Sequence, residues 1–238
     1  MSQAEEALSA RARRAQELAV AAAAAGLPLG VLGGAAVEIL SPSARPGGRW
    51  SRSLADIDVA TVAKRRRAVE ELIVSQRFSA DKQFNMMNGS MRLRFFDEDS
   101  SHLDVFVDEM RLCHPIMWGS SLHPGATTLP VALLLLSKLQ IVQIEEKDRG
   151  DLSALLTDQW KAIGAVDGQL GSILRKDWGL LHTASLNLEK LVSSEDELVA
   201  LRAAELLKRW AGLRPSIKAR LRGAVGERMR WYEEPEEV

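Results

Sequence analysis

Three aspartates in short apolar segments are the residues of this chain best suited to chemistry. Asp56 and Asp58 flank Ile57, and Asp104 lies within the apolar run 103–107. Because side chains alternate across a strand, Asp56 and Asp58 project from one face, and a neighbouring strand would bring Asp104 beside them. Three clustered carboxylates repel one another unless a divalent cation binds, so the pattern predicts a site for Mg²⁺ or Mn²⁺.

A pair of glycines, Gly33 and Gly34, follows the first short apolar segment at residues 29–32. A glycine turn that leads into a helix presents backbone N–H groups, which bind phosphate. Carboxylate-held metal ions beside such a turn suit phosphoryl or nucleotidyl transfer, in which one ion activates the attacking oxygen and a second ion neutralises the leaving pyrophosphate. Paired glycines alone are common in turns, so the order of the three elements carries the prediction.

Composition describes an ordinary globular protein, with 46% hydrophobic and 26% charged residues among 238. The net charge of -1 gives no overall attraction to nucleic acid. The segment from Arg202 to Arg230 contains nine Lys or Arg and only two acids. This excess of positive charge fits either a phosphate-attracting surface or solvated helix faces. The single Cys113 and the absence of a bilayer-length apolar run favour a cytoplasmic protein without membrane contact.

Apolar periodicity and turn residues predict an α+β domain followed by helices. The predicted helices and strands of the first part lie at about 3–25 (helix), 29–32 (strand), 35–40 (helix), 56–61 (strand), 64–76 (helix), and 78–87, 91–96 and 102–107 (strands). Asn88-Gly89 predicts a hairpin between two of these strands. Beyond Val131 the pattern is helical throughout. We therefore expect an α/β domain at 1–112, a linker at 113–129 and a helical domain at 130–238.

The Gly-Gly turn, the alternating Asp-Ile-Asp and the later Asp104 together resemble the DNA polymerase β-like nucleotidyltransferase superfamily. Lys138 and the run 147–151 resemble the K…KDxxD element of the abortive-infection nucleotidyltransferases, which include type IV toxins of toxin–antitoxin systems. Nearly the whole chain, including residues 230–237, is similar to a bacterial nucleotidyltransferase-like family without an assigned function.

This resemblance implies a small mixed sheet with flanking helices and an α-helical C-terminal domain. It also implies a metal-dependent enzyme that binds ATP or another NTP and moves its NMP to an acceptor hydroxyl on RNA, protein or a small molecule, releasing pyrophosphate. The implied catalytic and metal-binding residues are Asp56, Asp58 and Asp104, and the implied nucleotide-binding residues are Gly33, Gly34, Lys138 and Lys147.

Departures from the superfamily keep a second function open. Ala35 follows the glycines where the superfamily has a serine hydroxyl, and the gap from Gly34 to Asp56 is longer than usual. The alternative is a non-catalytic nucleotide- or nucleic-acid-binding module, as in one half of a toxin–antitoxin pair. Lys138 fits a buried stem as well as a triphosphate contact, and acids at 148 and 151 fit helix capping equally well.

Overall fold

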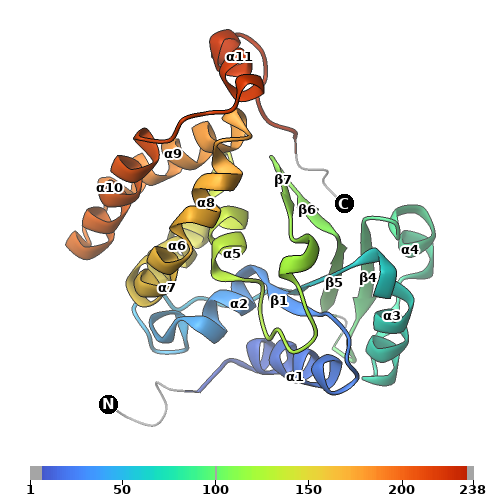
Figure 1. Ribbon diagram of the computed structural model, residues 1–238. Helices are drawn as coiled ribbons and strands as arrows, with labels where there is room; N and C mark the ends of the chain where they lie inside the picture. The colour runs from blue at the N-terminus through green and yellow to red at the C-terminus, as the bar shows by residue number, and fades with distance from the viewer. Residues whose placement is uncertain (1–6, 100, 235–238) are drawn as a thin grey trace. The chain divides into compact units, whose positions relative to one another are not determined.

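The computed structural model describes residues 7–99 and 101–234 and has an α+β fold, which confirms the predicted class (Figure 1). The chain divides into two compact units, Met1–Met110 with Met117–Pro130, and Arg111–Ile116 with Val131–Val238. The segment at 113–129, for which the sequence predicts a linker, is therefore shared between the two units.

A five-stranded mixed sheet forms the centre of the first unit. Its order is β1-β2-β5-β4-β3, with β2 and β5 parallel and the other neighbours antiparallel. The strands are β1 (Gly30–Leu32), β2 (Ile57–Thr61), β3 (Ser79–Ala80), β4 (Arg92–Phe96) and β5 (His102–Val107).

Alternation along β2, β4 and β5 gives the sheet one apolar and one polar face. Ile57 and Val59 of β2 are buried. Their neighbour Asp58 lies opposite Asp104 of β5, and Asp104 lies opposite Arg94 of β4. Register partners point to the same side of a sheet, so a row of charged side chains crosses its polar face.

The helices of the first unit differ from those that the sequence predicts: the first and third are shorter, the second is longer, and the fourth forms where a strand is predicted. They are α1 (Ala10–Ala24), α2 (Gly33–Leu40), α3 (Arg66–Ser75) and α4 (Lys82–Asn88), with 3₁₀ turns at Pro42–Ala44, Ala63–Arg65 and Gly119–Ser121. Of the helix predicted over 3–25, residues 3–6 lie outside the described residues. The helix begins after Ser9, whose side chain accepts a hydrogen bond from the backbone N of Ala12 at 3.3 Å.

The hairpin predicted at Asn88-Gly89 is wrong. Only Ser79–Ala80 is extended there, and the chain then forms α4 instead of continuing as a strand. The carboxylate of Asp81 caps this helix by accepting a hydrogen bond from the backbone N of Phe84 at 3.0 Å. Gly89 lies at the C-cap, so the Asn-Gly pair ends a helix. The helix cap at Asp81, seven residues before Asn88, therefore outweighs the local turn signal.

The second unit is helical, as its apolar periodicity predicts. Its helices are α5 (Val131–Leu139), α6 (Glu146–Asp158), α7 (Trp160–Ala165), α8 (Asp167–Leu174), α9 (Trp178–Val192), α10 (Glu197–Ala211) and α11 (Ile217–Val225), with a 3₁₀ turn at Gly226–Arg228. Two short strands, β6 (Glu109–Arg111) and β7 (Pro115–Met117), pair where the chain passes between the units.

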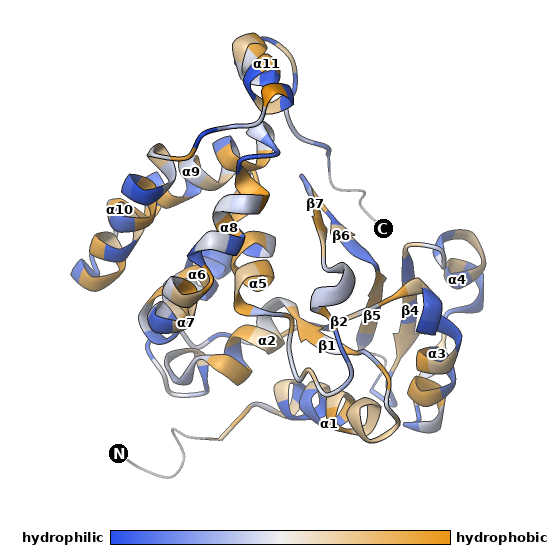
Figure 2. Cartoon of the chain, in the orientation of Figure 1, coloured by the Kyte–Doolittle hydropathy of each residue, from blue (hydrophilic) through white to orange (hydrophobic). Residues whose placement is uncertain are grey.

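Amphipathic helices build the core of the second unit. Along α10 the buried residues Val199, Ala203, Leu206 and Trp210 recur at helical spacing, and Figure 2 shows apolar and polar residues interleaved on this helix. In the part of the chain that the structure describes, no helix is long and apolar enough to cross a membrane.

Two titratable side chains of the second unit, His114 and Cys113, are buried. His114 lies with Nε2 at 2.9 Å from the Thr183 hydroxyl, which also accepts a hydrogen bond from the Trp231 indole at 3.0 Å. Burial lowers the pKa of His114, so the neutral ring is favoured. Burial also raises the pKa of the Cys113 thiol, which is unfavourable for a nucleophile.

A buried carboxylate joins α2 to the start of α1. Glu38 is 2% exposed, and its oxygens accept hydrogen bonds from the backbone N of Ser9 at 2.5 Å and from the Ser9 hydroxyl at 2.9 Å. These bonds satisfy donors at the N-terminus of α1, where helices have unpaired N–H groups. The first helix therefore depends on a contact with the second.

We predict that Glu38→Ala lowers the free energy of unfolding by about 1–3 kcal/mol, because the Ser9 donors lose their acceptor. The matched control is Glu17→Ala, since Glu17 is exposed and pairs with Arg14 at 3.6 Å. That surface pair contributes less than about 1 kcal/mol. Urea unfolding measures both variants, and equal losses would contradict this role for Glu38.

Candidate active site

The glycine turn at the start of α2 lies against two charged side chains. Gly33 has a positive φ of 68°, and a Cβ added there would overlap the Oδ2 atom of Asp58. A Cβ added to Gly34 would overlap the guanidinium group of Arg52. Gly33 therefore needs glycine for its backbone conformation and for the close approach of a carboxylate, whereas the atoms that crowd Gly34 are the ends of the Arg52 and Leu54 side chains.

Adjacent strands bring two of the three predicted carboxylates together. Asp58 and Asp104 are register partners in the parallel pair of β2 and β5, whose spacing is about 4.8 Å. Asp58 is half-buried and Asp104 is 2% exposed. Asp56 lies just before β2 and is exposed. Asp58 and Asp104 therefore lie on one face of the sheet, as the alternation of side chains predicts.

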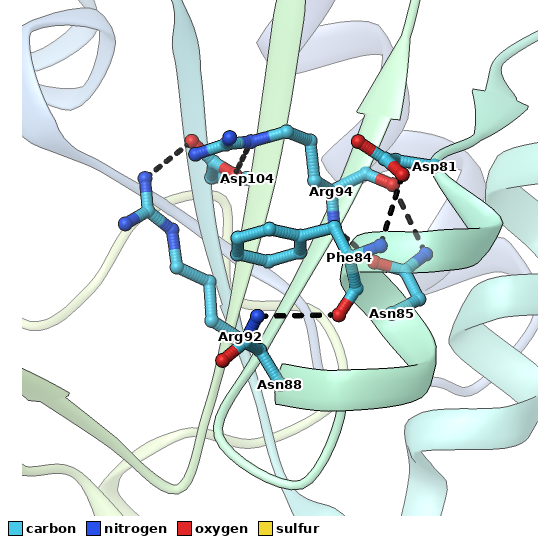
Figure 3. Close-up of polar contacts among 7 residues, drawn as sticks. All are labelled: Asp81, Phe84, Asn85, Asn88, Arg92, Arg94 and Asp104. Carbon is cyan, nitrogen blue, oxygen red and sulfur yellow. Dashed lines mark hydrogen bonds and ion pairs between the residues drawn. The ribbon is translucent and has the colours of Figure 1, made fainter. Parts of the chain in front are cut away.

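The buried carboxylate of Asp104 is held by two arginines of the next strand (Figure 3). Arg92 Nη2 lies 2.6 Å from its Oδ2, and Arg94 Nε lies 3.1 Å from its Oδ1. Both oxygens of Asp104 are therefore engaged by guanidinium groups. Over residues 7–99 and 101–234, no group of three or more His, Cys, Asp or Glu side chains could hold a metal ion.

In the described residues Asp104 is thus paired with cations of the protein itself, and the three-carboxylate metal site stays a prediction. Arg92 and Arg94 are the residues that sequence reasoning missed. Their i, i+2 spacing in Arg-Leu-Arg gave a signal, since it places both on one face of a strand. Which strand lies beside β5 is a tertiary feature that this local pattern does not contain.

Aromatic rings and an amide fix both arginines in place. The Arg94 guanidinium carbon lies 4.3 Å from the centre of the Phe84 ring, and that of Arg92 lies 5.0 Å from the Phe106 ring. Asn85 accepts a hydrogen bond from the backbone N of Arg94 at 2.6 Å and donates one to its carbonyl at 3.0 Å. Phe84 and Asn85 of helix α4 therefore contact Arg94, as Figure 3 shows.

The remaining acids have the donor chemistry for one metal ion. Mg²⁺ in phosphate-binding sites is commonly held by one or two carboxylates, together with phosphate oxygens and waters. Asp58 lies against the glycine turn and Asp56 lies two positions before it in the chain, so the pair supplies two carboxylates of this kind. The residues therefore fit a single ion held by Asp56 and Asp58, and Asp104 in its observed pairing does not fit as a ligand.

Lys138 lies in a buried ion-pair cluster within the second unit. Its amine is 2.7 Å from Asp151 Oδ2 and 3.7 Å from Asp148 Oδ1, and all three side chains are largely buried. Asp148 also accepts a hydrogen bond from the backbone N of Glu145 at 3.3 Å, as part of a capping box. The structure thus gives Lys138 two carboxylate partners and gives Asp148 a capping role.

Lys147 has different surroundings. Its side chain is 59% exposed, and its amine lies 2.9 Å from Glu145 Oε2. Exposed pairs of this kind contribute little to stability. Of the two lysines in the K…KDxxD element, Lys138 is therefore embedded in the core and Lys147 lies at the surface.

Comparison with solved structures finds distant structural similarity. No protein-family model matches the chain, and no curated protein matches it. The chain is similar to the crystal structure of an antigenic nucleotidyltransferase-like protein from Paracoccidioides brasiliensis, with 16% identity over 92% of this chain and 99% of that chain. The TM-score is 0.42, and a similarity at this level assigns no role to any residue.

We predict that Gly33→Ala destabilises the protein more than Gly26→Ala does. Both glycines have similar positive φ values, 68° and 66°, so the backbone strain is matched at roughly 1–2 kcal/mol. A Cβ at Gly26 meets nothing within 4 Å, whereas one at Gly33 displaces Asp58. Urea unfolding compares the two variants. Equal losses would show that the Asp58 carboxylate does not pack against the turn.

We expect Lys138→Met to lower the free energy of unfolding by about 3–5 kcal/mol, because Asp148 and Asp151 lose a buried counter-ion. Lys147→Ala is the matched control and should cost less than about 1 kcal/mol, because its pair is exposed. Chemical denaturation measures both values. A small loss in Lys138→Met would show that the buried cluster does not stabilise the second unit.

Proposed function

We propose that the first unit binds a nucleoside triphosphate and that the protein is a nucleotidyltransferase. The reaction would move a nucleoside monophosphate to an acceptor hydroxyl and release pyrophosphate. The observation that carries this proposal is the close approach of the Asp58 carboxylate to Gly33, with Asp104 opposite Asp58 in the sheet. The positive φ of Gly33 and its lack of a Cβ let a half-buried carboxylate lie directly against a turn that leads into a helix.

Each residue of the turn region would have a distinct role. The backbone N–H groups at Gly33 and Gly34 would bind phosphate oxygens, which needs no hydroxyl at Ala35. Asp56 and Asp58 would hold Mg²⁺ or Mn²⁺, which neutralises charge on the phosphates. The guanidinium of Arg52, against Gly34, would add positive charge at the same turn.

A second candidate function is a non-catalytic nucleotide-binding module, as in one half of a toxin–antitoxin pair that acts by association. The specific observation in its favour is the pairing of Asp104. Both oxygens of this carboxylate are already bonded to guanidinium groups, so an attacking hydroxyl would have to compete with them. The transferase proposal, by contrast, leaves the acceptor open: it fits an RNA 3′ end, a protein hydroxyl or a small molecule.

We predict that the wild-type protein with Mg²⁺ and lysate-derived acceptors releases pyrophosphate from at least one of ATP, GTP, CTP and UTP, and that Asp58→Asn does not. The control is Glu71→Gln, an exposed acid of α3 that pairs with Arg67 at 3.3 Å. This control should keep the wild-type rate. Labelled NTPs in the same assay show whether the label enters RNA, protein or a small solute.

The outcomes separate the two candidate functions. Nucleotide binding by calorimetry without pyrophosphate release from any NTP supports the non-catalytic module. A wild-type rate in Asp58→Asn would contradict the assignment of the site itself.

A further inference from the structure

Two arginines on the polar face pair with the third of the carboxylates for which the sequence predicts metal ions. Arg92 and Arg94 project from the same face of β4, and both bond to Asp104. Their combined formal charge equals that of one divalent ion. The third carboxylate is therefore neutralised by the protein itself, before any ligand or metal binds.

The arginines lie closer to solvent than the acid that holds them. The side chain of Asp104 is 3% exposed, whereas those of Arg92 and Arg94 are 25% and 12% exposed. A ligand that reaches this part of the face therefore meets guanidinium groups first. An anion is attracted there, and a metal ion is repelled.

The pairing leaves donors of the guanidinium groups unused by Asp104. Each guanidinium has five N–H groups in a planar fork that suits phosphate, and the Arg92 contact to Asp104 is made through Nη2. The Nε atom of Arg92 is buried and has no hydrogen-bond partner among the described residues. An unsatisfied buried donor is destabilising, so the pairing with Asp104 does not fully compensate the burial of Arg92.

We propose that Arg92 and Arg94 bind the phosphate groups of the nucleotide and that Asp104 is a positioning residue for them, not a metal ligand. This inference rests on the proposed nucleotide site. Asp104 lies beside Asp58 across the sheet, so the two arginines border the carboxylates at the glycine turn. The polar face then holds one metal ion at most at Asp56 and Asp58, and the two guanidinium groups replace the second.

The proposal predicts phosphate binding without metal. A site of three bare carboxylates would repel pyrophosphate in EDTA, whereas two guanidinium groups attract it. Calorimetry with inorganic pyrophosphate in EDTA tests the wild-type protein directly, with no variant needed. Measurable binding supports the proposal. Binding in Mg²⁺ with none in EDTA overturns it and leaves the proposed nucleotidyltransferase function intact.

Substitution of the arginines tests whether they are the residues that bind pyrophosphate. Arg92→Gln should weaken pyrophosphate binding in EDTA about tenfold to a hundredfold, because a charge-assisted contact is lost. Arg67→Gln is the matched control, since Arg67 is an exposed arginine of the same unit, and it should bind as the wild type does. Equal affinities in the two variants would place the anion elsewhere. Melting temperatures confirm that both variants are folded.

Metal affinity separates a positioning role for Asp104 from a ligand role. Paramagnetic resonance of Mn²⁺ without nucleotide should give similar metal affinities for Asp104→Asn and the wild type, and a large loss for Asp58→Asn. A comparable loss in both variants would make Asp104 a metal ligand and overturn the inference. Pyrophosphate binding in EDTA without any transfer from NTPs would instead keep the inference and remove the catalytic proposal.

Discussion

Neutralising the buried carboxylate of Asp104 is the constraint on which the polar face of the sheet depends. A carboxylate that is 2% exposed is costly unless cations and hydrogen bonds compensate it. Arg92 and Arg94 provide both, and they reach Asp104 only because β4 and β5 pair in one particular register. A slip by one residue would turn every side chain of β4 to the opposite face and leave the acid unpaired.

The same constraint explains the position of α4. Phe84 of this helix packs under the Arg94 guanidinium, and Asn85 bonds to the backbone of Arg94. A second strand at this position, as a hairpin at Asn88-Gly89 would require, would not supply the same ring and amide. Helix α4 therefore covers the edge of the sheet and also holds Arg94 in the position from which it pairs with Asp104.

Features that depend on local sequence pattern, such as strand faces and helices, could be predicted from the sequence. Features that depend on which strands are neighbours, such as the partners of Asp104, could not. Alternation around Asp58 and Asp104 was sufficient to place both on one face, and apolar periodicity was sufficient to predict the helices of the second unit. The partners of Asp104 come from another strand, so no spacing around Asp104 contains them. For Lys138, the sequence left a buried stem and a triphosphate contact open, and the structure shows an amine paired with Asp151 and Asp148.

The central claim is that guanidinium groups and one metal ion share the polar face, and anomalous diffraction tests it most directly. Crystals grown with Mn²⁺ and a non-hydrolysable NTP would show each metal position independently of the protein model. We predict manganese at Asp56 and Asp58 and phosphate oxygens bonded to Arg92 and Arg94. A manganese ion bound to Asp104, with the two arginines displaced, would contradict this account.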